Sequence, residues 1–296
     1  MRYPASIVVA SLVVLAGLGA ASCAGDDPQI VSNAGAADAG GVVEEGGGAE
    51  AGVDASTDGT RADAAARCVD PVVAPGAAFH FDACEVELTS ATTAGNWRDR
   101  VGQGVALGTA GYEPNGAGTH PALRFSDHQY VFAHAVGNDV VTGQFALVVV
   151  GRYAAGGGFQ GGVFAAKVDN QSNPVGPLLA GNYLVDQSTP TQGLGGQLKL
   201  GATSAYVNTD LAGPLRVMTL WRNTDNLELR ANGVRLAFAA LPLADAFDNG
   251  AAPWTFGRAR SDQNLAGAIA EIILIKAPTE ATLTKLEGDL KLRYGL

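Results

Sequence analysis

Glu271 is the one carboxylate in an otherwise apolar run, GAIAEIILIK, from Gly267 to Lys276. Such a run is typical of a β-strand that is covered on both faces. A carboxylate inside it either performs acid–base chemistry or accepts hydrogen bonds, because a buried charge must be paired or hydrogen-bonded. The choice between the two depends on the fold around Glu271.

Residues of the kind that bind sugars gather in two predicted loops. Sugar recognition combines an aromatic ring against the pyranose face with amides and carboxylates for the hydroxyl groups. The candidate ligand-binding residues in these loops are Trp97, Arg98, Asp99, Tyr112, Asn115, Asp127 and Tyr130. For Trp97, the favoured alternative is a core side chain beneath a loop.

Calcium is the metal that the sequence fits best. Calcium binds hard oxygen ligands from loops next to strands, and the candidates are Asp99, Asp127, Asn138 and Asp139. No stretch has the regular carboxylate spacing of a dedicated calcium loop, so ordinary Asx turns are the favoured interpretation. His128 and His134 would be roughly 20 Å apart on one strand, too far for a shared ion.

Catalytic patterns are few. Glu85 and Glu87 alternate along one predicted strand and therefore share a face, but an exposed edge near Cys84 explains them better. No GxSxG, HExxH or GxxxxGK[ST] motif occurs. The glycine-rich segments lie in predicted loops and are not followed by the helix that a phosphate cradle requires.

The N-terminal segment predicts export and membrane attachment. Arg2 and the apolar stretch Ile7–Leu18 predict a signal peptide over residues 1–22. The following Ala20-Ala21-Ser22-Cys23 resembles a bacterial lipobox, which implies a lipid on Cys23. Because Ala20 stands where leucine is commonest, ordinary cleavage after Ala21 or Ser22 is the alternative.

Residues 23–67 predict a disordered tether. Residues 24–67 hold nine Gly and twelve Ala among 44 residues and no aromatic residue, so they cannot form a packed core. A Gly-rich chain of this length spans roughly 35 to 40 Å on average. Ala24, and not Asp, follows the cysteine, which by the sorting pattern of many Gram-negative lipoproteins predicts the outer membrane.

The cysteine count agrees with a lipid anchor. With Cys23 acylated, Cys68 and Cys84 remain as one pair in an oxidising compartment. The predicted disulfide closes a loop in the unfolded chain, and this closure stabilises the fold by about 3 kcal/mol.

The distribution of charge argues against a nucleic-acid partner. The 296-residue chain has a net charge of −10, with nine of its 29 acidic and three of its 19 basic residues before Cys68. The remainder carries a net charge of −4. No basic field is therefore available to attract phosphate backbones.

From Cys68 onward the pattern predicts an all-β sandwich with one C-terminal helix. Short apolar runs alternate with Gly, Asn, Asp and Pro clusters. The strongest predicted strands are Phe145–Tyr153, Gly161–Val168, Leu215–Trp221 and Gly267–Lys276. After Pro278, Thr279 can cap a helix with Leu283, Leu286 and Leu290 at helical spacing, which ends at Tyr294-Gly295.

The segment NLELRANGVRLAF, residues 226–238, predicts a β-hairpin with a two-residue Asn232-Gly233 turn. The predicted register pairs Ala231 with Val234, Leu229 with Leu236 and Leu227 with Phe238. Glu228, Arg230 and Arg235 then share the outer face. The two arginines are candidates for an acidic glycan, although a solvated face is favoured.

Several segments together carry a family resemblance. They are FHFDA (79–83), NWRDRVGQG (96–104), PALRFSDHQYV (121–131), LELRANGVRL (227–236) and AGAIAEIILIK (266–276) with a leucine helix ending RYGL. In this order they resemble the concanavalin A-like lectin and glucanase superfamily, and its laminin G-like bacterial members in particular.

The resemblance implies an antiparallel jelly roll of about a dozen strands over residues 68–296. Members bind glycans or proteins, often with calcium, or hydrolyse polysaccharides. In similar modules a glutamate recurs at the position of Glu271 and accepts hydrogen bonds from nearby backbone, so a structural role is favoured. The glucanase branch needs alternating Glu, Asp and Glu on one strand, which this sequence lacks.

The sequence therefore predicts a non-catalytic, lipid-anchored surface module that binds a glycan or a partner protein. The alternatives are a diverged glycoside hydrolase or polysaccharide lyase of the same fold, and a structural or adhesive surface protein without a small ligand.

Replacing Cys23 by Ser should release the protein from the membrane, because the lipid has no other attachment point. Fractionation of cells that express the two forms measures this. A Cys23→Ser protein that stays in the membrane fraction contradicts the predicted anchor.

Overall fold

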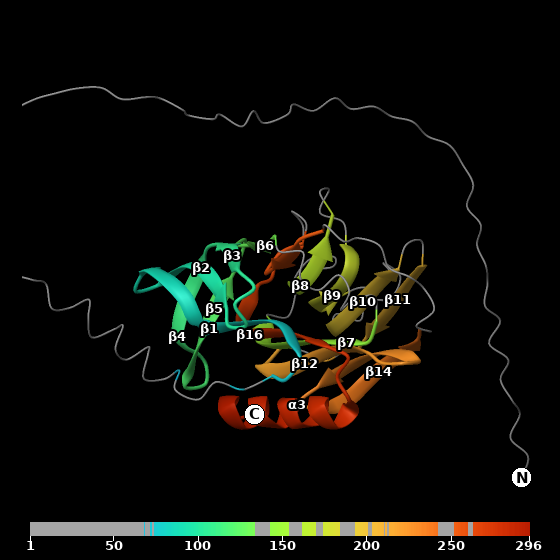
Figure 1. Ribbon diagram of the computed structural model, residues 1–296. Helices are drawn as coiled ribbons and strands as arrows, with labels where there is room; N and C mark the ends of the chain where they lie inside the picture. Colours follow the sequence, from blue (N-terminus) through green and yellow to red (C-terminus); the bar gives the residue numbers. More distant parts are fainter. Residues whose placement is uncertain are drawn as a thin grey trace, which may run out of the picture. The chain divides into compact units, whose positions relative to one another are not determined.

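The computed structural model describes residues 68, 72, 74–133, 143–153, 162–169, 174–183, 193–200, 203–209, 211, 213–241, 252–259 and 263–296. All of them belong to one compact unit, Val53–Leu296. Within these ranges the chain is all-β with one C-terminal helix, which confirms the predicted fold class (Figure 1).

The described strands pair antiparallel in two sheets. Sheet A contains β1 (Ala77–Ser90), β2 (Thr93–Asp99), β4 (Ala110–Ala117), β5 (His120–Phe125), β7 (Phe145–Tyr153), β12 (Arg216–Arg222), β13 (Asn226–Ala231), β14 (Val234–Ala240) and β16 (Gly267–Lys276). Sheet B contains β6 (Tyr130–Phe132), β8 (Val163–Val168), β9 (Pro174–Tyr183), β10 (Gly193–Leu200), β11 (Thr203–Asn208) and β15 (Trp254–Phe256). Strand β3 (Val105–Gly108) pairs with β2 and with β6 and so joins the sheets.

Strand β16 lies at the centre of sheet A. Strand β7 pairs along its whole length, while β5 and β1 share its other edge. A register shift between Ile269 and Glu271 marks a β-bulge. Because side chains alternate along a strand, the extra residue brings Ala268 and Glu271 to the same face of the sheet.

The two sheets enclose an aromatic core. Neighbouring rings in it have centroids 5.0 to 6.1 Å apart, mostly tilted or edge-to-face, as aromatic pairs prefer. Its members are Phe79, Phe81, Trp97, Phe132, Trp254 and Phe256. The sandwich is thus held by the residues that alternate inward from both sheets.

Helix α3 (Glu280–Tyr294) covers the face of sheet A that points away from sheet B (Figure 1). Thr279 caps it by accepting a 3.1 Å hydrogen bond from the Thr282 amide, and Gly295 ends it in the left-handed conformation. The predicted leucines are buried against the sheet together with Tyr294. The predicted helix and its caps are confirmed.

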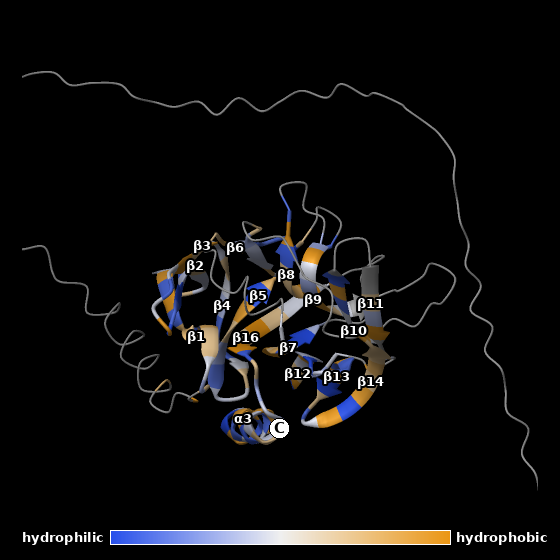
Figure 2. Cartoon of the chain, turned by 45° about the vertical axis from the view of Figure 1, so that its right-hand side comes forward, coloured by the Kyte–Doolittle hydropathy of each residue, from blue (hydrophilic) through white to orange (hydrophobic). Residues whose placement is uncertain are grey.

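The β13–β14 hairpin forms at the predicted turn, but its predicted register is wrong beyond the first pairs. Ala231 pairs with Val234, as expected, whereas Leu229 pairs with Ala237 instead of Leu236. A bulge in β14 adds one residue, which turns Leu236 and Phe238 outward. Phe238 is 62% exposed, and Figure 2 shows orange hydrophobic segments along this edge strand.

The predicted disulfide between Cys68 and Cys84 is present, with the Cα atoms 5.8 Å apart. It fastens the chain that precedes the sandwich to β1. Cys23, residues 23–67, Asn138, Asp139 and His134 lie outside the described residues. In the part that the structure describes, no helix is long and apolar enough to cross a membrane.

Replacing both Cys68 and Cys84 by Ser should lower the free energy of unfolding by about 3 kcal/mol, because a 16-residue loop is no longer closed in the unfolded chain. Urea denaturation of the two proteins measures the difference. Equal midpoints, or free thiols at these positions before reduction, would contradict the prediction.

Candidate functional site

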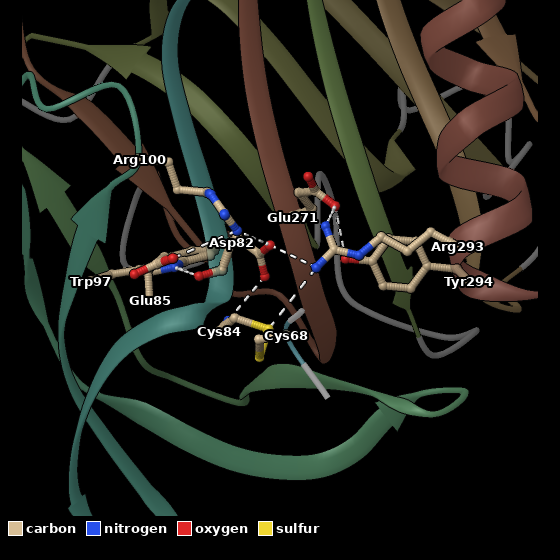
Figure 3. The surroundings of a disulfide bond; sticks show 9 residues. All are labelled: Cys68, Asp82, Cys84, Glu85, Trp97, Arg100, Glu271, Arg293 and Tyr294. Atoms are coloured by element: carbon tan, nitrogen blue, oxygen red, sulfur yellow. Dashed lines mark hydrogen bonds and ion pairs between the residues drawn. A yellow bond between two sulfur atoms is a disulfide. The ribbon is translucent and has the colours of Figure 1, made fainter. Parts of the chain in front are cut away.

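A buried network of charges joins β1, β16 and α3 (Figure 3). Arg293 donates to Asp82 at 2.8 Å and to Glu271 at 3.3 Å. Arg100 donates to the same Asp82 oxygen at 2.8 Å. Both carboxylates are almost fully enclosed, so their charges depend on these guanidinium groups.

Glu271 has a structural role in this network, as the sequence favours, but its partners differ from those expected. It contacts side chains instead of backbone: the His80 ring at 2.5 Å, Arg293, and the Tyr294 hydroxyl, which donates at 2.8 Å. Burial raises the pKa of Tyr294 well above its usual range, and the negative charge of Glu271 raises it further. The phenol therefore remains a proton donor to Glu271.

The same cluster resembles a metal site, because ligand atoms of His80, Asp82 and Glu271 lie within 4.8 Å of one another. Two guanidinium groups already hold the carboxylates. A cation there would have to displace the half-buried Arg100 or the enclosed Arg293 side chain. The arrangement is that of a structural ion network.

The aromatic residues that the sequence offers as sugar platforms lie in the core. Trp97 and Tyr130 have no exposed surface and Tyr112 is 7% exposed. The Trp97 indole donates to the Asp82 carbonyl at 2.7 Å, and the Tyr130 hydroxyl donates to the Gly95 carbonyl at 2.7 Å. Trp97 therefore has the core role that the sequence favours for it. The prediction of a ligand platform is wrong for Tyr112 and Tyr130, because both rings are buried.

Asp99 is a turn residue. Its carboxylate accepts hydrogen bonds from the amides of His80, Val101 and Gln103 at 2.6, 3.2 and 2.7 Å. These bonds fix the bend after β2, which is the Asx turn that the sequence favours over calcium. Calcium binding at Asp99 is therefore not supported.

Asp127 and Asn115 are exposed residues. Asp127 accepts a hydrogen bond from the Ser126 hydroxyl at 3.1 Å. Among the described residues, neither joins a cluster of three potential metal ligands. Asp139, the third predicted calcium ligand, falls outside the description, so the structure leaves that position open.

The two hairpin arginines have different surroundings. Arg230 is buried, lies 3.6 Å from Glu287 of α3 and stands over the Trp221 ring. Arg235 has a 58% exposed side chain and lies 3.5 Å from Glu228. Of the pair, Arg235 is therefore the residue that a ligand can reach.

We call four side chains at the hairpin the hairpin patch: the exposed Arg235 and Phe238, the half-buried Asn223, and Glu228, which is buried with 6% of its surface exposed. The Arg235 guanidinium carbon lies 5.3 Å from the centre of the Phe238 ring. Asn223 donates to Glu228 at 2.9 Å. The patch combines an accessible aromatic face with a cation, a carboxylate and an amide.

A second surface feature is a shallow pocket of about 460 Å³ at one end of β5, β7 and β16. Arg124 and Arg152 line it, and both lie near Glu113. Sequence reasoning missed this site, since the residues are far apart in the chain. The available signal was an arginine ending each of two buried strands, LRF and VGRY.

Comparison with known proteins supports the fold. No family model matches the chain, and no curated protein matches it in sequence. The binding domain of botulinum neurotoxin DC in complex with SialylT has a TM-score of 0.53 at 12% identity, covering 73% of this chain and 52% of that one. The same binding domain in complex with rat synaptotagmin II has a TM-score of 0.52 at 11% identity, covering 74% and 52%.

A third similar structure is domain 4 of AbnA, a GH43 extracellular arabinanase from Geobacillus stearothermophilus, in complex with arabinotriose. Its TM-score is 0.48 at 14% identity, covering 64% of this chain and 91% of that domain. This chain spans about half the length of the neurotoxin chains. At these identities the likeness establishes a shared β-sandwich fold and nothing finer.

Replacing Glu271 by Ala should lower the free energy of unfolding by about 3–5 kcal/mol, because Arg293 would be left buried with one partner fewer. Urea denaturation measures the loss. Glu85→Ala is the matched control: Glu85 has a 42% exposed side chain and lies 3.6 Å from Arg100, so its loss should cost less than about 1 kcal/mol. Equal effects of the two substitutions would contradict a structural role for Glu271.

Proposed function

We propose that this protein is a non-catalytic surface module that binds a glycan or a partner protein. The observation that carries the proposal is the hairpin patch, where Phe238 presents 62% of its surface beside Arg235 and Glu228. An isolated exposed phenylalanine is common, but here a guanidinium group lies 5.3 Å from the ring centre and Glu228 pairs with Phe238 across the hairpin. That combination matches the chemistry of sugar recognition.

The patch is arranged to contact a sugar ring from one side. A pyranose has an apolar C–H face, which packs against an aromatic ring, and hydroxyl groups at its rim. The exposed Arg235 guanidinium and the half-buried Asn223 amide donate hydrogen bonds to such hydroxyls, and the buried Glu228 carboxylate holds these two side chains in place. The existing contacts among these side chains hold them near one position before a ligand arrives.

The shared fold supports a binding role. The neurotoxin structures with the same sandwich are binding domains, one in complex with SialylT and one with rat synaptotagmin II. We accordingly include a protein among the possible ligands of this chain. We assign the sandwich to the concanavalin A-like, laminin G-type jelly rolls on the sequence segments quoted above.

The contacts of Glu85 and Glu87 support a non-catalytic role. A glycosidase needs two carboxyl groups on either side of the scissile bond, one of them protonated. Glu85 lies 3.6 Å from Arg100, and Glu87 accepts a hydrogen bond from Arg98. Both carboxylates are thus already paired with arginines.

We further propose that Cys23 carries a lipid and that residues 23–67 form the tether, with the protein at the outer membrane or cell surface. Support comes from the lipobox-like sequence and from the Cys68–Cys84 disulfide, which suits an oxidising compartment. A tether of this composition would let the module reach ligands away from the lipid surface.

A glycan array probed with the purified protein, with and without calcium, tests the proposal. We expect binding that Phe238→Ala weakens about tenfold, because the ring supplies most of the apolar contact. Leu292→Ala is the matched control, since Leu292 is an 84% exposed apolar residue on α3. Array binding that Phe238→Ala leaves unchanged would move the ligand site elsewhere, and no binding to any glycan would favour a protein ligand.

A further inference from the structure

The pocket at the end of β5, β7 and β16 contains two arginines from separate strands. Arg124 and Arg152 each pair in register with Ala268, which lies on the strand between them. Residues paired in this way point to the same face, here the face that carries α3. The arginine backbones are two strand spacings apart, roughly 9.5 Å. The two arginine backbones therefore stand on opposite sides of a small residue.

Small residues leave few side-chain atoms above this part of the sheet. Ala268 separates the arginines, and Gly267 lies beside it in the pocket lining. A Cβ atom at Gly111, which pairs with Arg124, would meet the Arg124 Nε at 3.1 Å. The Arg124 side chain thus lies over Gly111, and the guanidinium groups of Arg124 and Arg152 both reach Glu113 on β4.

The charges in the pocket are unequal. Glu113 accepts a 2.6 Å hydrogen bond from Arg152 and lies 3.9 Å from Arg124. In the described part of the chain, no other carboxylate lies within 4.0 Å of either arginine. The side chains of Arg124 and Arg152 are 66% and 45% exposed. One carboxylate thus faces two accessible cations, and the pocket has an excess positive charge.

The remaining lining supplies contacts of other kinds. Phe125 and Tyr153 contribute apolar surface, and Ser126 contributes a hydroxyl. Because the Ser126 proton is donated to Asp127, its oxygen remains available as an acceptor. A volume of about 460 Å³ lies within the usual range for small-ligand sites and accommodates one sugar ring.

We propose that this pocket binds the carboxylate of an acidic sugar, such as a uronic acid residue. A guanidinium group matches the planar carboxylate with two parallel hydrogen bonds. Ser126 accepts from a sugar hydroxyl, and Glu113, beside the pocket, disfavours dianions such as phosphate by repulsion. The inference rests on the proposed glycan-binding function and adds a ligand class and a second contact site to it.

Calorimetric titration of the purified protein with a uronic acid trisaccharide and with its carboxyl-reduced, neutral counterpart tests the inference. We expect the acidic trisaccharide to bind about tenfold more tightly, as one charge-assisted pair implies. Arg124→Ala and Arg152→Ala should each abolish this preference. Arg98→Ala is the matched control. Arg98 is a 62% exposed arginine on β2, and it pairs with Glu87 of β1.

Glu113→Gln provides a test in the opposite direction. The amide keeps the size of the side chain and removes the charge that competes with the ligand, so the acidic trisaccharide should bind several-fold more tightly. Equal affinity for the two trisaccharides, or equal losses in Arg98→Ala and Arg124→Ala, would overturn the inference.

The outcomes separate the two proposals. Suppose that array glycans bind, that Phe238→Ala weakens their binding, and that the arginine variants leave the affinity for the acidic trisaccharide unchanged. In that case only the pocket inference fails. If neither trisaccharide nor any array glycan binds, the proposed glycan-binding function fails and the pocket inference fails with it. Tighter binding of an acidic peptide than of the acidic trisaccharide would also overturn the inference.

Discussion

The ion pairs of Arg293 hold together the first strand, the central strand and the helix. From the last turn of α3 Arg293 reaches Asp82 of β1 and Glu271 of β16, all of them buried. Removing Arg293 would leave Glu271 enclosed without a guanidinium partner and Asp82 with Arg100 alone, which disfavours other arrangements of the three elements. The disulfide ends at Cys84, whose amide donates to Asp82, so the N-terminal attachment meets the same network.

The function that we propose uses the surface of sheet A that α3 leaves uncovered. The hairpin patch lies at one edge of that sheet, on β13 and β14, and the arginine pocket lies at the ends of β5, β7 and β16. Both use long side chains projecting from paired strands. Rigid strands hold such side chains more precisely than loops do, which suits a binding surface.

Local rules predicted much of the fold. Hydrophobic periodicity located β7 and the helix, turn chemistry located Asn232-Gly233, and the cysteine count identified the disulfide. The candidate site was predicted less well. Trp97 and Tyr130 were offered as ligand platforms and are core residues, whereas Phe238 was assigned to the core and is exposed. A single bulged residue reverses which face a side chain occupies, and no local pattern in β14 announces it.

The sequence by itself determined the all-β class, the capped C-terminal helix and the pairing of Cys68 with Cys84, because each follows from neighbours in the chain or from a count. Only the tertiary structure decided that Glu271 meets Arg293, that Arg230 is buried against α3, and that Arg124 and Arg152 stand on either side of Ala268. These relations join distant segments, and strand order and register set them through the packing of the whole sandwich.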